Sequence, residues 1–236
     1  RDYSSYTYAM SDYIKQFPWY AFGKPPSEIA KHVAKLCSGA DQVSLTDFVR
    51  MDGSVSYLSR ELERSALLRA FDEEFRDELS ELYRSQHTLS AKTTLGVRYD
   101  TDATRLSGSP ETSLCNTILN AFIVYLGFRM TKTRDGHMSH QEAWDRMMRS
   151  LLGGDDGLIP DICPEANSRA AKLVGQTIEQ TTIPRGEMGV QFLSRIYGPD
   201  VWNGDSSSCC DVMRQLSKFH TTPRLNSVVT PRLKLL

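Results

Sequence analysis

Two adjacent aspartates, Asp155 and Asp156, are the residues whose type and spacing most clearly permit chemistry. They follow the apolar pair Leu151-Leu152, glycines stand on both sides, and Leu158-Ile159 comes next. The apolar runs predict two strands, and the glycine-rich centre predicts a tight turn between them. Because adjacent carboxylates repel each other, a cation is expected there, and Mg²⁺ held by one or two carboxylates plus substrate phosphates is the usual solution.

A third carboxylate, Asp47, ends a segment with the alternation of a strand. Val43, Leu45 and Asp47 alternate with Ser44, Thr46 and Phe48. Alternate residues of a strand point to opposite faces, so the pattern predicts a strand that carries a carboxylate at its end. Asp52 follows after four intervening residues. Taken alone, an aspartate at a strand end is explained equally well by turn chemistry.

A Ser107-Gly108 loop precedes a segment with helical periodicity. Leu114, Ile118, Phe122 and Tyr125 recur at helical spacing, and Thr112, Asn116 and Asn120 form a neighbouring polar stripe. A polar stripe beside an apolar one is usually a solvated face. A Ser-Gly loop that leads into an amide-bearing helix is also suited to hold a sugar.

The order Asp-x4-Asp, Ser-Gly-x3-Thr-x3-Asn and Gly-Asp-Asp resembles motifs A, B and C in the palm of positive-strand RNA virus RNA-dependent RNA polymerases. The resemblance covers roughly residues 43–197. It is most similar to the nodavirus RNA replicases. Four phrases carry this narrower resemblance: Trp-Tyr-Ala-Phe-Gly-Lys-Pro at 19–25, Arg-Met-Asp-Gly-Ser at 50–54, Leu-Ser-Gly-Ser-Pro-Glu-Thr at 106–112, and Gly-Gly-Asp-Asp-Gly-Leu at 153–158.

The resemblance implies template-directed nucleotidyl transfer from NTPs to an RNA 3′-hydroxyl by a two-metal-ion mechanism. Asp47 and Asp155 would bridge two Mg²⁺ ions, with Mn²⁺ as the alternative metal, and Asp156 would be a weaker or outer ligand. In the ribose pocket, Asp52 and Asn116 would read the 2′-hydroxyl that distinguishes RNA from DNA. Residues Ser107, Gly108 and Thr112 would complete this pocket. For Asn116 alone, a hydrogen bond to nearby backbone is the alternative reading.

Two cations are candidates for work at the leaving pyrophosphate. Lys172 lies on the helix that resembles motif D, and Arg185 lies in the loop that follows. The sequence does not decide which of the two is the general acid or phosphate contact, although an arginine does not give up a proton readily. Motif F, which binds the triphosphate in this family, has no convincing match in residues 1–40. A strand pair at 189–197 resembles motif E, whose primer-side residues would be Phe192, Leu193, Ser194 and Arg195.

Strands and helices occur in mixed order without regular βαβ alternation, which predicts the α+β class. The resemblance implies a right-hand polymerase palm, a small antiparallel sheet backed by helices, with parts of the fingers and the start of the thumb. One helix is expected over residues 57–84, with a solvated charged face. The chain divides into a fingers or palm entry segment (1–42), motif A (43–60), a fingers insertion (61–104), motifs B to E (105–198) and the start of the thumb or a C-terminal extension (199–236).

Composition sets looser bounds. The net charge of −1 gives no global basic signal, so RNA binding would need a local basic channel. Five cysteines, an odd number without Cys-x2-Cys pairs, favour a reducing compartment. The longest apolar stretch, residues 121–128, is too short to span a bilayer.

The resemblance also implies partners and a location. The partners would be an RNA template, the nascent strand, NTPs and further copies of the chain in a replication complex. The location would be the host cytoplasm, at the mitochondrial outer membrane, with membrane contact through segments that precede the matched region.

Three other readings compete with a polymerase. A catalytically incomplete palm fragment could act as an RNA-binding or self-assembling scaffold. A reverse transcriptase would carry a bulky aromatic residue in place of Asp52-Gly53, and a calcium-binding turn at Asp155-Asp156 would need a spaced run of oxygen ligands. The chain shows neither of these last two patterns.

Overall fold

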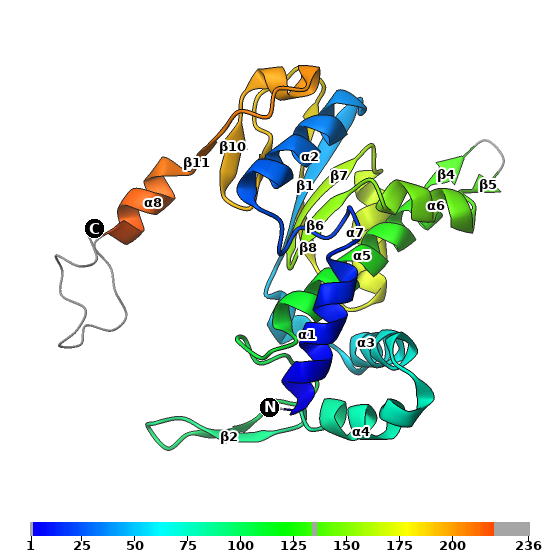
Figure 1. Cartoon of the computed structure of the whole chain (residues 1–236), viewed down its shortest axis with the longest axis vertical. Coiled ribbons are helices and arrows are strands. Elements are labelled where there is room, and N and C mark those ends of the chain that lie inside the picture. The colour runs from blue at the N-terminus through cyan, green and yellow to red at the C-terminus, as the bar shows by residue number, and fades with distance from the viewer. Residues whose placement is uncertain (1, 134–135, 220–236) are drawn as a thin grey trace.

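The computed structural model describes residues 2–133 and 136–219, and a four-stranded antiparallel sheet lies at its centre (Figure 1). The strands, in spatial order, are β6 (Leu151–Gly153), β7 (Asp156–Pro160), β1 (Gln42–Phe48) and β8 (Ile178–Pro184). Strand β1 pairs with β7 from Val43 opposite Pro160 to Thr46 opposite Gly157. It pairs with β8 along its whole length. The predicted α+β class with a small antiparallel sheet is confirmed.

Helices cover both faces of this sheet. Helix α2 (Pro26–Ser38) lies on one face, and α5 (Thr112–Met130) and α7 (Pro164–Leu173) lie on the other (Figure 1). Val43 packs in the α2 cluster, whereas Phe48 packs against α5 and α7. The alternation of β1 thus directs its side chains to two cores. Full burial of each large apolar side chain contributes about 1.5–3 kcal/mol.

Helix α5 is the central helix of the molecule. It is long and apolar enough to cross a membrane by length and composition, but 61% of its apolar window is buried inside the protein, as in the core helix of a soluble fold. A Cβ atom on Gly127 would lie 2.9 Å from Asn167 Oδ1 and 3.1 Å from an Ile162 methyl carbon. The absence of a side chain at this position therefore allows α5 and α7 to approach closely.

The expectation of one helix over residues 57–84 is wrong. The segment forms α3 (Tyr57–Ala70) and α4 (Glu73–Arg84), because Phe71 is extended with φ −121° and ψ 152° and Asp72 begins the next helix. The expected solvated charged face is also wrong in part. Arg60 and Glu63 are only 2% and 0% exposed. Periodicity alone could not reveal this, because their burial depends on partners elsewhere in the chain.

Smaller elements surround this framework. They are α1 (Asp2–Ile14), η1 (Met51–Ser54), β2 (Ser90–Lys92), β3 (Arg98–Asp100), β4 (Lys132–Thr133), β5 (Gly136–His137), α6 (His140–Met147), β9 (Gln191–Phe192), β10 (Arg195–Tyr197), η2 (Pro199–Asn203), β11 (Ser208–Cys210) and α8 (Val212–Phe219). Strands β9, β10 and β11 form a separate three-stranded sheet. Helix α8 extends away from the body (Figure 1). The five-segment division stays a prediction, and residues 220–236 of its last segment lie outside the described residues.

Candidate active site

The turn between β6 and β7 carries Asp155 and Asp156, and the end of β1 lies beside it. Gly153 pairs with Asp156 across the hairpin, and Thr46 of β1 pairs with Gly157. Asp47 is the next residue of β1. The antiparallel register therefore brings together carboxylates that are far apart in the sequence, which is the convergence that the motif order predicts.

The electrostatics of this turn reflect that convergence. Burial raises the pKa of Asp156 to about 6, and the charges of Asp155 and Asp47 add to the increase, while Arg214 opposes it. Burial also raises the pKa of Asp155, and Asp47 and Asp52 add to it. Within residues 2–133 and 136–219, no lysine or arginine lies within ion-pair distance of Asp47, Asp155 or Asp156. The site thus holds negative charge that a divalent cation would neutralise.

Carboxylate oxygens are the ligands that Mg²⁺ prefers, so the donor type and the charge fit this metal. Over the part of the chain that the structure describes, no three His, Cys, Asp or Glu side chains are already grouped to hold a metal ion. The acidic groups are therefore close enough to influence each other's pKa but do not form a ready-made coordination shell.

Two glycines allow the hairpin to sit against β1. Gly154 has φ +69°, in the left-handed region that glycine adopts without a steric penalty. A Cβ atom on Gly157 would lie 2.3 Å from Thr46 Oγ1. A side chain at position 157 would therefore require Thr46 or the strands that carry these residues to shift next to the acidic turn.

Helix α5 holds the turn by side-chain hydrogen bonds to its backbone. Thr117 Oγ1 accepts a hydrogen bond of 2.8 Å from the Gly154 amide. Asn120 Nδ2 donates to the carbonyls of Gly154, at 3.1 Å, and Asp156, at 3.2 Å. Sequence reasoning placed Asn120 on the polar stripe without a role and missed Thr117. The available signal was the position of Thr117 and Asn120, two polar residues three apart, in the apolar middle part of the helix.

A second polar cluster surrounds Asp52. Asn116 Nδ2 donates to Asp52 Oδ1 at 2.9 Å, and the Ser107 hydroxyl donates to Asp52 Oδ2. Thr112 Oγ1 donates to the Leu106 carbonyl at 3.2 Å, which closes the loop that contains Gly108 (φ +88°). The structure therefore brings together the residues that the resemblance assigns to ribose recognition. The alternative, in which the Asn116 amide bonds to nearby backbone, is not observed, because its Nδ2 donates to Asp52.

The two cations proposed for the leaving pyrophosphate lie in different surroundings. Lys172 is exposed in the last turn of α7. Arg185 follows β8 at the end opposite Asp47, because Gln42 pairs with Pro184 whereas Asp47 pairs with Glu179. Arg185 Nη1 donates to three carbonyls near the end of α2, and its Nη2 donates to the Trp202 carbonyl. The structure does not bring Arg185 to the acidic turn.

The segment that resembles motif E forms the β9–β10 hairpin. Its two turn residues, Leu193 and Ser194, have φ values of +46° and +61°, and Phe192 pairs with Arg195. Leu193 Cδ2 would lie 3.4 Å from a Cβ atom on Gly153. The hairpin therefore packs against β6 next to the acidic turn, while Arg195 donates to the hydroxyl and carbonyl of Ser208.

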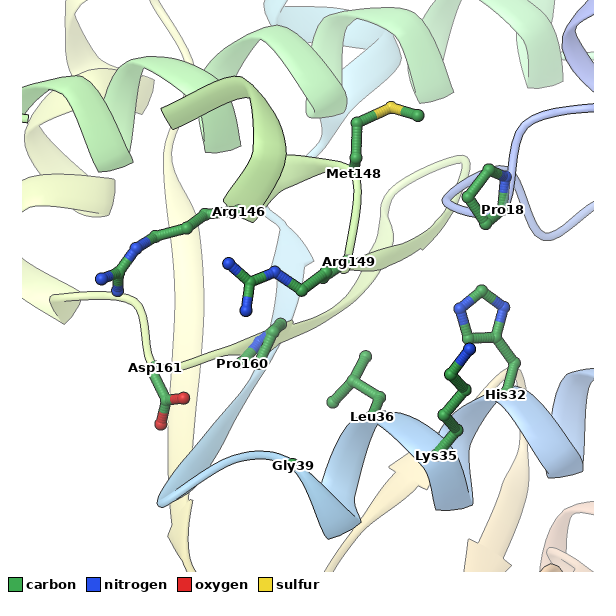
Figure 2. Close-up of a pocket in the computed structure, with 10 residues that line it drawn as sticks. All are labelled: Pro18, His32, Lys35, Leu36, Gly39, Arg146, Met148, Arg149, Pro160 and Asp161. Carbon is green, nitrogen blue, oxygen red and sulfur yellow. The ribbon is translucent and has the colours of Figure 1, made fainter. Parts of the chain in front are cut away.

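A pocket of about 280 Å³ lies at the other end of β7 and is distinct from this site. Figure 2 shows that His32, Lys35, Arg146 and Arg149 surround it, with Asp161 at one edge. Arg146 is paired with Glu142 at 3.3 Å, and Asp161 Oδ1 accepts hydrogen bonds from two backbone amides. Its positive lining contrasts with the acidic turn.

Solved structures identify the class of fold. The RNA-dependent RNA polymerase of a human picorbirnavirus aligns with a TM-score of 0.69 over 86% of this chain and 38% of its own chain, at 17% sequence identity. An insertion-loop deletion mutant of that enzyme aligns equally well, with a TM-score of 0.69 over 86% of this chain and 39% of its own, at 16% identity. The fold is therefore that of a viral RNA-dependent RNA polymerase.

Sequence comparison narrows the relationship. The chain is 34% identical over 223 residues to the RNA-directed RNA polymerase of Greasy grouper nervous necrosis virus, which covers 93% of this chain and 22% of the relative. It is 32% identical over 231 residues to that of Flock house virus, which covers 94% of this chain and 22% of the relative. No protein-family model matches the chain. The chain is related to the nodavirus RNA-directed RNA polymerases, as its motifs predict, and it spans about a fifth of their length.

Proposed function

We propose that this chain is the catalytic palm of an RNA-directed RNA polymerase. Its reaction would be the attack of an RNA 3′-hydroxyl on the α-phosphate of an NTP, with release of pyrophosphate. The observation that carries this proposal is the position of Asp47, at the end of β1, beside the Asp155-Asp156 turn. A palm-type transferase needs acidic groups from two strands at one point, and a scaffold without catalysis does not.

Asp47 and Asp155 would hold the metal ions, with Asp156 as a weaker ligand. Two Mg²⁺ or Mn²⁺ ions bound there would activate the attacking hydroxyl and neutralise charge on the leaving pyrophosphate. Thr117 and Asn120 would keep the turn in the orientation that presents both of its carboxylates. Burial, with the neighbouring carboxylates adding to it, raises the pKa of Asp155 and Asp156, and this crowding of acidic groups supports the assignment.

The Asp52 cluster would select the sugar. The Asn116 amide and the Ser107 hydroxyl, which donate to Asp52, can instead donate to a ribose 2′-hydroxyl, and Asp52 can accept a hydrogen bond from that hydroxyl. A deoxynucleotide offers no 2′-hydroxyl to this cluster and gains none of these hydrogen bonds, and a site built to bond a hydroxyl discriminates strongly against an analogue that lacks it. Gly108 and Thr112 would shape the loop that carries Ser107.

At the pyrophosphate, Lys172 is the better of the two candidates for a proton donor. Arg185 uses its guanidinium on backbone carbonyls at the end of α2 and on the Trp202 carbonyl, and a guanidinium does not release a proton readily. The β9–β10 hairpin, with Phe192, Leu193, Ser194 and Arg195, would brace the primer end of the nascent strand.

The partners of the proposed enzyme would be an RNA template, a nascent strand and NTPs. We also propose that copies of the chain assemble in a replication complex on the mitochondrial outer membrane of the host cell, with Mg²⁺ as the resident metal. Support for assembly, membrane contact and location comes only from the resemblance to nodavirus replicases.

Primer extension tests the proposal. The assay uses the longest natural polypeptide that contains this sequence, together with a primed RNA template, NTPs and Mg²⁺. Asp155→Asn should abolish incorporation while RNA binding is retained. Asp145→Asn, which changes an exposed aspartate on α6, is the matched control and should remain active. Undiminished incorporation by Asp155→Asn would overturn the proposal.

A further inference from the structure

A buried arginine, Arg105, stands between the Asp52 cluster and two buried glutamates. Its side chain is 0% exposed. Arg105 Nη2 donates to Glu63 Oε1, and Nη1 lies 3.5 Å from Glu111 Oε1. Its backbone amide donates to the Asp52 carbonyl at 2.9 Å. The residue is thus bonded to Asp52 through its main chain and fixed by the glutamates through its side chain.

The Nε donor of Arg105 lies near Asp52 without bonding to it. Arg105 Nε lies 3.9 Å from Asp52 Oδ1 and has no hydrogen-bond partner, although it is buried. A buried donor without a partner is rare and costly. A relative movement of about 1 Å would bring these two atoms to hydrogen-bond distance.

A second arginine completes the buried network but does not contact Asp52. Arg60 Nη1 lies 2.5 Å from Glu111 Oε1 and 3.6 Å from Glu63 Oε2. Its Nε and Nη2 donate to the carbonyls of Ala103 and Thr104. Two arginines and two glutamates therefore balance each other's charge, and this balance makes the burial of both arginines tolerable.

The glutamates have little freedom to move. The Tyr83 hydroxyl lies 3.1 Å from Glu63 Oε2 and 2.8 Å from the Arg60 carbonyl, and the Tyr3 hydroxyl donates to Glu111 Oε2. Both tyrosines are nearly inaccessible to solvent. The guanidinium of Arg105 is consequently held in one place, with its unpartnered Nε 3.9 Å from the Asp52 carboxylate.

We propose that Arg105 is a positioning residue that holds Asp52 when a ribonucleotide is bound, and that it thereby contributes to ribose selection. In the described state, Asn116 and Ser107 both donate to Asp52. When these donors turn to a ribose 2′-hydroxyl, Asp52 loses them, and Arg105 Nε replaces them. This inference rests on the proposed function and adds a residue that supports the sugar-reading carboxylate from behind.

The two roles open to Arg105 differ in what they change. If Arg105 only stabilised the fold, its loss would lower incorporation of ribonucleotides and deoxyribonucleotides alike. If it supports Asp52 in the ribonucleotide complex, its loss lowers kcat/KM for an NTP much more than for the matching dNTP. The ratio of these two values is therefore the informative quantity.

The test measures this ratio by primer extension with UTP and dUTP in the same full-length protein. Arg105→Lys keeps the positive charge but not the three-way fork, and the ratio should fall about ten-fold. Arg60→Lys is the matched control, because it alters the same network without a contact to Asp52. The NTP to dNTP ratio of Arg60→Lys should stay within two-fold of the wild-type ratio. The thermal unfolding midpoints of Arg60→Lys and Arg105→Lys should be roughly equal.

A double-mutant cycle with Asp52→Asn tests the route of the effect. In the Asp52→Asn background, Arg105→Lys should change the ratio no further. Equal ratios for wild type and Arg105→Lys, or an equal fall in both backgrounds, would overturn the inference. If Arg105→Lys does not fold, Glu63→Gln replaces it in the test, because this change weakens the bond that holds Arg105 Nη2. The same ratios are then measured and judged in the same way. If wild type itself shows no incorporation, the proposed function fails rather than this inference.

Discussion

Loss of the Asn120 amide should disable the acidic turn more than its cost in stability explains. Asn120 is 1% exposed, and its Nδ2 serves two carbonyls, those of Gly154 and Asp156. Asn120→Ala removes both hydrogen bonds and leaves two carbonyls without that donor. At about 1–2 kcal/mol for each, the free energy of unfolding should fall by about 2–4 kcal/mol. For a chain of this size, the midpoint should fall by roughly 5–15 °C.

A matched control exists in α7. Asn167 is also 1% exposed, and its Nδ2 donates to Gln180 Oε1 of β8 at 3.0 Å rather than to the turn. In both Asn120 and Asn167, the Oδ1 atom is buried and has no hydrogen-bond partner. Asn167→Ala should therefore lower stability without altering the conformation of the turn.

The assay combines denaturant unfolding with primer extension at a temperature where both variants are fully folded. Asn120→Ala should lose at least ten-fold more kcat than Asn167→Ala, because the 155–156 turn is no longer fixed to α5. Equal activity of the two variants at matched folded fractions would refute the reasoning that α5 holds the catalytic turn.

Two further predictions follow from the same site. In metal-free buffer, the unfolding free energy of wild type relative to Asp156→Asn should rise as the pH falls from 7 to 5. The pKa of Asp156 is raised from 3.8 to about 6 in the folded state, so the folded protein takes up a proton in this pH range that the unfolded chain does not. A difference in unfolding free energy between the two proteins that does not change with pH would contradict this. Gly157→Ala should lower the unfolding free energy by about 1–3 kcal/mol because its Cβ would meet Thr46 Oγ1 at 2.3 Å. In denaturant unfolding, adding Thr46→Ala to Gly157→Ala should restore most of the lost unfolding free energy. Gly53→Ala, at a glycine with open space around it, should change the unfolding free energy little. No rescue by Thr46→Ala would exclude the steric explanation.

Much of the sheet was accessible from the sequence because its signals are local. The alternation around Asp47 and the glycines around Asp155 and Asp156 each specify a strand or a turn within a few residues. The pairing of Asp52 with Asn116 could be expected only through the family resemblance. No spacing rule joins a residue after β1 to a helix that begins 60 residues later.

The errors have a common physical origin. The break at Phe71 was missed because the charged and apolar periodicity continues across it. The burial of Arg60 and Glu63 was missed because charged residues are almost never fully buried unless paired. Their partners, Arg105 and Glu111, come from the loop before α5, and only the tertiary structure brings them together.

The most direct test of the central claim is anomalous diffraction from crystals of this protein with Mn²⁺ and a non-hydrolysable NTP. The account predicts two anomalous peaks roughly 3.5–4 Å apart, between the Asp47 carboxylate and the Asp155 carboxylate, with the triphosphate bound to both. A triphosphate and metal bound elsewhere, or Mn²⁺ that contacts only one of these two aspartates, would contradict it.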